Sequence, residues 1–419
     1  MSSGIKKQNI FQIISLTGLI LYIIAVFFGP TGPQWPQKLE DAGEISMSNP
    51  VNQVVYTIIF LLSLVSVLPK YKVLLKWLDA EKYIIFFFAW CAITIVWAID
   101  STVSFKRLFQ YLTTSLVFIS VLINYGSERQ ILNTIKYLLS SYVLISLIVV
   151  LIIPQATDPT FDTWRGLHPT KNNLGQTASL CIIFFTYYFY TSKKLIEKSI
   201  VLFLLFISVL LLVGAFSMTN IILMFIFTSV FIFIRITKIF SKLGIGSKFS
   251  LLTLFFSLMI ISSVFIIAPD LYLAIFDIVG KDPTLTGRTE IWALVLSASI
   301  DDLIIGVGFQ SFWIPQHLVT IELFKYWIPT QSHNGYVDLV LETGIVGLSL
   351  FIFSVIFVLK QVSFKEDILW VLFILFAILL NFSESTFIRP HHPTNVMFYA
   401  SFWVISYKTK FIFSKNEII

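Results

Sequence analysis

The feature that most constrains this chain is a series of long apolar runs that recurs from one end to the other. The first of them, 10-IFQIISLTGLILYIIAVFFG-29, contains no charged residue, and roughly 20 apolar residues cross the hydrocarbon core of a bilayer. Only 12% of all residues are charged, about half the fraction of a soluble domain. A membrane β-barrel would show short alternating strands instead. The sequence therefore predicts an all-α, polytopic integral membrane protein.

The apolar runs predict about twelve transmembrane helices. The first run has no small-residue cleavage site, so we expect it to remain as a helix rather than to be removed as a signal peptide. We expect residues 1–419 to form a single membrane domain. The expected spans are residues 10–29, 51–69, 82–98, 109–125, 137–153, 174–192, 199–214, 220–234, 249–268, 335–359, 368–386 and 394–407.

The distribution of basic residues predicts how these spans are oriented. If the N-terminus is cytoplasmic, 20 of the 29 Lys and Arg residues fall in cytoplasmic segments, which is the bias that membrane proteins show. Both termini are therefore expected in the cytoplasm. One outside segment, residues 269–334, is far longer than the others, and long loops usually have a function. We expect this periplasmic loop to contain a helix near 290-EIWALVLSASI-300 and to carry part of the active site.

Several function classes are disfavoured by what the sequence lacks. The net charge of +6 comes from short basic clusters between apolar runs, which is typical of topology signals, so no nucleic-acid partner is expected. The chain contains no G-x-x-x-x-G-K-[ST] motif, no H-E-x-x-H or Cys/His ligand set, and no G-x-S-x-G turn. These absences argue against ATP-driven, zinc-dependent and serine-nucleophile chemistry. We expect neither a metal nor a cofactor.

The strongest candidate for chemistry is His333, in 332-SHNGYVDLVLETG-344. Ser332 is expected to cap a helix that continues to about residue 359. Carboxylates on a membrane helix are costly unless they face a wet cavity or a cation. The alternative is a polar cluster that only positions the helix at the interface. Three polar residues follow His333 at intervals of four and would form one ridge on the helix: Asn334, Asp338 and Glu342.

Cations on the outer side form the second group of candidates, because the topology rule does not require them there. Arg288, in 286-TGRTEIW-292, would begin a helix, and a guanidinium beside a helix N-terminus suits an anion. Arg165 and Lys171 lie in 165-RGLHPTKNNLGQ-176. The alternative is that all three are ordinary interfacial cations. His168, directly before Pro169, is expected to be a loop residue rather than a catalytic one, and His391 and His392 give a signal too weak to assign a role.

Taken together, these segments resemble the O-antigen ligase and Wzy-type polymerase superfamily, and its exopolysaccharide polymerase branch in particular. The matching segments are 165-RGLHPTKNNLGQ-176, 286-TGRTEIW-292, 306-GVGFQSFW-313 and 332-SHNGYVDLVLETGIVGL-348, and the resemblance covers about residues 85–405. It implies a GT-C-like glycosyltransferase of the bacterial inner membrane whose active site faces the periplasm. The implied donor and acceptor are oligosaccharides on undecaprenyl diphosphate, and no metal or sugar nucleotide takes part.

The resemblance also implies roles for individual residues. Arg165 and Arg288 would bind the diphosphate, and His333 would act as the general base that activates the acceptor hydroxyl. Apart from the resemblance, we expect Lys171 to join the two arginines at the diphosphate. We also expect the residues on the ridge after His333 to support it, by orienting the histidine or the acceptor or by holding a cation.

Three functions stay open at this point. The first is polymerisation of lipid-linked repeat units of an O-antigen, a capsule or an exopolysaccharide, with a chain-length regulator as a candidate partner. The second is an O-antigen ligase that transfers the glycan to lipid A core in lipopolysaccharide biosynthesis. The third is a flippase for lipid-linked glycans or another twelve-span transporter. Transporters usually show internal repeats, and the chain has no obvious repeat, so the pattern favours an enzyme that faces outwards.

Overall fold

The computed structural model describes residues 2–29, 33, 35, 50–158, 162–241, 288–318, 329–363 and 366–412. The described part is mainly helical, and its strands are the short antiparallel pair β1 (Thr157–Asp158) and β2 (Thr163–Trp164). The chain divides into two compact units, Met1–Asn220 with Ala298–Ile419 and Ile221–Ser297. The first of these, called the main unit below, contains most of the candidate site. The predicted single membrane domain over residues 1–419 stays a prediction.

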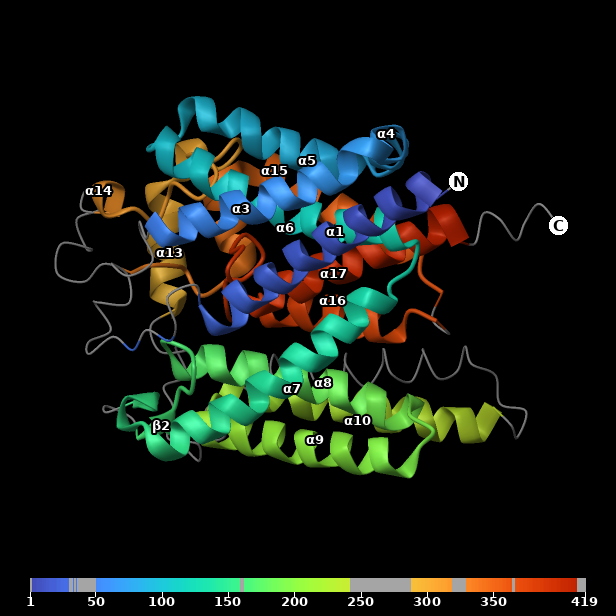
Figure 1. The fold of residues 1–419 in the computed structure, drawn as a ribbon. Coiled ribbons are helices and arrows are strands. Elements are labelled where there is room, and N and C mark those ends of the chain that lie inside the picture. Colours follow the sequence, from blue (N-terminus) through green and yellow to red (C-terminus); the bar gives the residue numbers. More distant parts are fainter. Residues whose placement is uncertain are drawn as a thin grey trace. The chain divides into compact units, whose positions relative to one another are not determined.

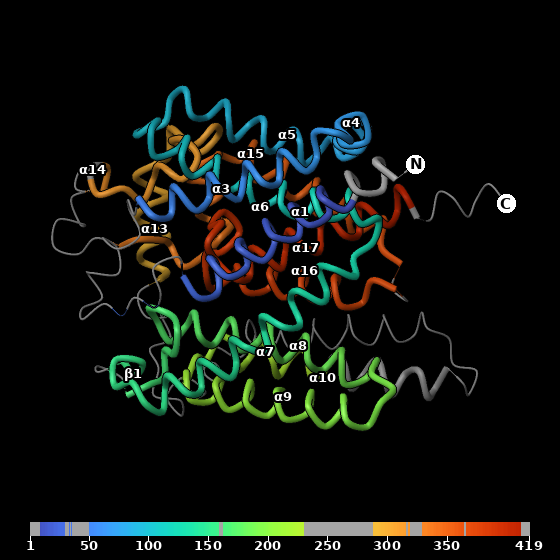
Figure 2. The backbone as a smooth tube through the Cα atoms, viewed as in Figure 1, coloured from blue at the N-terminus to red at the C-terminus, as the bar shows by residue number. Residues whose placement is uncertain are grey.

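The first half of the main unit runs from α1 to α9. Its helices are α1 (Ser2–Phe28), α3 (Pro50–Val67), α4 (Tyr71–Ala80), α5 (Lys82–Ile93), α6 (Ser101–Tyr125), α7 (Arg129–Ile152), α8 (Lys171–Thr191) and α9 (Leu195–Ala215). Three short 3₁₀ turns, η1 (Leu68–Lys70), η2 (Thr94–Trp97) and η3 (Pro154–Ala156), connect them. Figure 2 traces the chain from α7 through the strand pair into α8.

The second half of the main unit contains the C-terminal helices. They are the 3₁₀ turn η4 (Ile300–Asp302), α14 (Pro315–Leu318), α15 (Gly335–Lys360), α16 (Ile368–Leu380), α17 (Pro393–Tyr407) and a π-helical end, η6 (Lys408–Ile412). Helix α10 (Met218–Ser241) begins in the main unit, and α13 (Arg288–Ala298) belongs almost wholly to the other unit. The expected helix near residues 290–300 is confirmed as α13.

Helices that are far apart in the sequence pack against one another in the main unit. Helix α1 lies against α3 and α6, α5 lies against α15, and α17 lies against both α16 and α6, while α8 pairs with α9 (Figure 1). The N-terminal ends of α8, α15 and α17 are each stabilised by a side chain that accepts a backbone hydrogen bond, namely Thr170, Asn334 and His392. Such caps replace the partners that the first turn of a helix lacks.

Six described helices are long and apolar enough to cross a membrane, as a helical membrane protein requires. They are Asn9–Phe28, Pro50–Ala80, Ser101–Tyr125, Arg129–Ile152, Leu195–Ala215 and Gly335–Lys360. The predicted span at 249–268 lies outside the described residues, and each of the other predicted spans overlaps a helix. The full set of about twelve spans stays a prediction.

Two predicted boundaries are wrong. The span expected at 368–386 ends at Leu380, because Asn381 caps the helix and the chain then forms a turn. Ser332 does not cap the next helix, because its hydroxyl bonds to the backbone of Asn334, and the Asn334 side chain accepts from the N–H groups of Tyr336 and Val337. Both differences place polar residues at the same end of the main unit.

Helix α15 is broken at Gly344, where φ is +70°. The backbone groups released by the break bond to the segment before it: Val307 and Gly308 donate to Leu341 and Glu342, and Ile345 donates to Leu303. Backbone groups at membrane depth need such partners inside the protein. The break therefore fixes residues 303–308 against the first half of α15. These residues include the start of the 306-GVGFQSFW-313 loop, which is held there with them.

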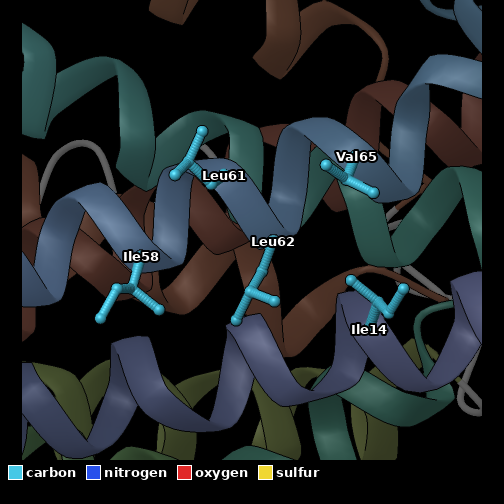
Figure 3. Close-up of a pocket in the computed structure, with 5 residues that line it drawn as sticks. All are labelled: Ile14, Ile58, Leu61, Leu62 and Val65. Atoms are coloured by element: carbon cyan, nitrogen blue, oxygen red, sulfur yellow. The ribbon is translucent and has the colours of Figure 1, made fainter.

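An apolar groove runs between α1 and α3, lined by Ile14, Ile58, Leu61, Leu62 and Val65 (Figure 3). The α3 side chains Ile58 and Leu62 point towards α1 in this view. All five lining residues are aliphatic, so this groove has no group that could bind an anion or move a proton. The candidate site lies elsewhere in the unit.

Candidate active site

His333 lies in the short turn that leads into α15. Its φ of +56° is in the left-handed region, which non-glycine residues adopt rarely and often at functional sites. The side chain is 33% exposed, and its Nδ1 lies 3.3 Å from Oε2 of Glu384. The turn thus holds the imidazole half-exposed, with one nitrogen facing a buried carboxylate.

Asp338 is the fully buried centre of the hydrogen bonds that hold this turn. Its Oδ1 accepts from Nε1 of Trp313 at 2.9 Å and from the backbone N–H of Ser332 at 3.1 Å. Its Oδ2 accepts from the hydroxyl of Ser385 and lies 3.4 Å from Nη2 of Arg389. Asp338 therefore joins the loop before α14, the turn before α15 and the turn after α16.

Glu342 lies one turn further along α15 and is also buried. It accepts from the backbone N–H of Gln310 at 2.8 Å, and the carbonyl of Gln310 accepts from Nη1 of Arg107 at 2.5 Å. The side-chain amide of Gln310 donates to the carbonyl of Ile388. Gln310 thus connects α15, α6 and the turn after α16, with φ at +50°.

The turn over residues 381–392 contributes residues that sequence reasoning missed. Arg389 donates to the carbonyl of Thr330 at 3.2 Å as well as pairing with Asp338, so it lies against the His333 turn. Glu384 is 4% exposed and accepts from Nδ2 of Asn172 at 3.1 Å. The available signal was a carboxylate inside a run read as a transmembrane span, where ionisable groups are rare and functional.

The predicted cations are placed separately. Arg165 is buried beside β2, and its Nε donates to the carbonyl of Gln155 at 2.7 Å. Burial lowers the pKa of the Arg165 guanidinium, and Asp158 acts in the opposite direction. Lys171 is the first residue of α8, next to Asn172. Arg288 is the first residue of α13, as expected.

The arrangement places one arginine, Arg389, against the turn that holds His333. The ridge predicted from sequence, Asn334, Asp338 and Glu342, is formed on α15 as one capping side chain and two buried carboxylates. Within the residues that the structure describes, no group of three or more His, Cys, Asp or Glu side chains is placed to hold a metal ion. The described residues include a histidine suited to proton transfer and arginines suited to stabilising negative charge.

Comparison with known proteins gives two matches. A protein-family model described as O-antigen ligase matches residues 203–352. That range includes α13, the 306–313 loop, His333 and the carboxylates of α15. The predicted resemblance to the O-antigen ligase and Wzy-type polymerase superfamily is confirmed. The helical class of membrane protein is confirmed with it.

The second match is to the exopolysaccharide production protein ExoQ of Rhizobium meliloti (strain 1021). It is 36% identical over 86 residues, which is 19% of this chain and 19% of ExoQ. The chain therefore matches about a fifth of that relative's length. This similarity agrees with the exopolysaccharide branch that the sequence predicts, and the activity of the whole chain is a matter for proposal.

Proposed function

We propose that the protein is a membrane glycosyltransferase that polymerises oligosaccharide repeat units carried on undecaprenyl diphosphate. The observation that supports this most is the half-exposed imidazole of His333, held in a left-handed turn by a buried carboxylate network. A histidine so placed is suited to take a proton from a hydroxyl near neutral pH. The similarity to an exopolysaccharide production protein supports a role in making an exopolysaccharide, and we infer polymerisation as the step.

The reaction that we propose is a direct displacement. His333 removes the proton of an acceptor sugar hydroxyl as that oxygen attacks the anomeric carbon of the donor glycan. The bond between that carbon and the diphosphate oxygen breaks, and the electron pair leaves with undecaprenyl diphosphate. No covalent intermediate forms, so the configuration at the donor carbon inverts.

The leaving diphosphate needs positive charge. We assign this role to Arg165 and Arg288, because a guanidinium binds phosphate with two parallel hydrogen bonds, and to Lys171, whose ammonium adds a point charge. Substitution Arg288→Lys keeps the charge and removes this fork, so it should weaken donor binding. Unchanged donor affinity in Arg288→Lys and Arg165→Ala would contradict the assignment.

Membrane placement belongs to the same proposal. The protein would lie in the bacterial inner membrane with about twelve spans, a GT-C-like arrangement and both termini in the cytoplasm. Residues 269–334 would form a periplasmic loop that carries part of the active site. A chain-length regulator is a candidate partner.

Two alternatives remain distinct from polymerisation. An O-antigen ligase would use the same donor and base but a lipid A core acceptor. A transporter or flippase would use broken helices whose freed ends face the cargo, whereas the groups freed in α15 are bonded to residues 303–308. That bonding favours an enzyme.

The deciding experiment supplies purified protein in lipid vesicles with lipid-linked repeat units, with or without lipid A core. The proposal predicts a ladder of longer glycans on undecaprenyl diphosphate in both mixtures. Glycan transferred only to lipid A core would identify a ligase, and movement of the units across the vesicle without new bonds would identify a flippase.

A further inference from the structure

Glu384 stands out because it is a nearly buried carboxylate that contacts the candidate base. Its Oε2 lies 3.3 Å from Nδ1 of His333, and its Oε1 accepts from Nδ2 of Asn172 at 3.1 Å. Glu384 lies 51 residues after His333, on the turn between α16 and α17. The contact therefore depends on the tertiary fold and not on the local sequence.

The hydrogen bonds behind Glu384 run in one direction. Asn220 donates through Nδ2 to the hydroxyl of Ser217 at 2.9 Å, and Ser217 donates to Oδ1 of Asn172 at 3.3 Å. Because Oδ1 of Asn172 accepts from Ser217, its Nδ2 is left to face Glu384. The chain of donors thus ends on the carboxylate, and hydrogen bonds to a carboxylate stabilise its charged form.

An ionised carboxylate can only accept hydrogen bonds. Nδ1 of His333 must then carry the hydrogen of the 3.3 Å contact with Glu384, and Nε2 is left with a lone pair. The amide nitrogen of Gln331 also lies 3.4 Å from Nδ1, and two N–H donors cannot bond each other. The Nδ1–H tautomer therefore requires this amide to be rotated by half a turn, so that its oxygen accepts from Nδ1. In that arrangement Nε2 is the nitrogen that can take a proton from a hydroxyl.

We propose that Glu384, held by Asn172, is a positioning residue that fixes the orientation and the tautomer of His333 and stabilises its imidazolium. This inference rests on the proposed role of His333 as the base. It also gives a role to Ser217, in the α9–α10 turn, and to Asn220, in the first turn of α10, which together orient Asn172. A residue that acts in this way changes the rate of proton transfer and leaves substrate binding alone.

The main test compares Glu384→Gln with wild type in the vesicle assay. Glutamine keeps the size and removes the charge, so kcat should fall by about 10²-fold or more while KM changes little. Glu197→Gln, at an exposed carboxylate on α9 that pairs with Lys194, is the matched control and should behave as wild type.

Asn172→Ala provides an independent variant if Glu384→Gln folds poorly. It should lower kcat by a smaller factor with the same KM, since Glu384 stays in place. Because Asn172 acts through Glu384, the double variant should be no slower than Glu384→Gln alone. Additive losses in the double variant, a change confined to KM, or wild-type kcat in the folded Glu384→Gln protein would each overturn the inference.

The same assay separates this inference from the proposed function. If His333→Ala is inactive and Glu384→Gln is fully active, only the positioning role is wrong. If His333→Ala turns over normally, the proposed base is wrong and the positioning role is wrong with it.

Discussion

His168 lies in the loop before α8. It is the most deeply buried of the histidines that the structure describes. It is 6% exposed, its ring faces Tyr142, and its Nε2 lies 2.9 Å from the hydroxyl of Thr177. Burial lowers the pKa of His168 from its ordinary value of 6.5 to about 4. The imidazole is therefore neutral at pH 7, as packing against apolar neighbours requires.

This burial makes stability depend on pH. Between about pH 6.5 and pH 4 the unfolded chain binds a proton at His168 that the folded chain excludes, so stability is complete above pH 6.5 and is lost as the pH falls. The loss at pH 5 should be about 2 kcal/mol. We expect the thermal midpoint in detergent to fall less between pH 7 and pH 5 in His168→Gln than in wild type. Equal falls in the two proteins would refute this.

Individual site residues were predictable only where they share a short segment. His333, Asn334, Asp338 and Glu342 are close in sequence, and helical spacing alone placed the last three together. Glu384 and Arg389 come from a turn that reads as the end of an apolar run. Their contacts with His333 and Asp338 span about 50 residues, and no local pattern encodes them.

At the scale of elements, the break in α15 is the feature on which the site depends. Gly344 has a φ of +70°, and a Cβ there would lie 2.1 Å from the carbonyl oxygen of Ile304. Gly126, the C-cap of α6, has the same φ, but a Cβ there would meet only the Tyr407 hydroxyl at 3.7 Å. Substitutions at these two glycines therefore distinguish the cost of backbone strain from the cost of a steric collision.

We predict that Gly344→Ala is much more destabilising than Gly126→Ala. The left-handed conformation costs an alanine about 1–2 kcal/mol at either position, and Gly344→Ala adds a collision with backbone that cannot move without losing the bonds to residues 303–308. Thermal unfolding of the two purified variants checks this. Similar unfolding midpoints for the two variants would mean that residues 303–308 do not hold the break at Gly344 in place.

Helix positions follow from the apolar pattern, and the break does not. The run over 335–359 reads as one continuous span, and the helix occupies Gly335–Lys360. The interruption at Gly344 requires residues 303–308 as backbone partners, which lie in a separate segment. The end of α16 was misplaced for a related reason, since Phe382 and Phe387 extend the apolar character beyond the last helical turn.

At the scale of the main unit, two buried polar clusters lie at opposite ends of α16 and α17. The candidate site is at the C-terminal end of α16 and the N-terminal end of α17. At the other ends Lys408 pairs with Asp367 at 2.6 Å and with Glu128 at 3.5 Å. Helix α17 has 15 residues, which is about 22 Å of helix. The predicted orientation makes the Lys408 end cytoplasmic.

We predict that a cysteine at position 194, in the α8–α9 connection, is protected from an impermeant maleimide in spheroplasts. A cysteine at position 155, in the turn η3 that follows α7, should be labelled. The native Cys91 and Cys181 are buried and should give little background. Labelling of position 194 but not of position 155 would reverse the orientation.

In the proposed reaction His333 removes the proton of the acceptor hydroxyl. The most direct measurement is single-turnover transfer by purified wild type, His333→Ala and His333→Gln, with donor binding measured separately on the same samples. General bases contribute about 10²–10⁴-fold, so both variants should bind the lipid-linked donor normally and transfer it slower by about that factor. Substantial transfer by His333→Ala, with donor binding intact, would contradict the account and assign the base to another residue.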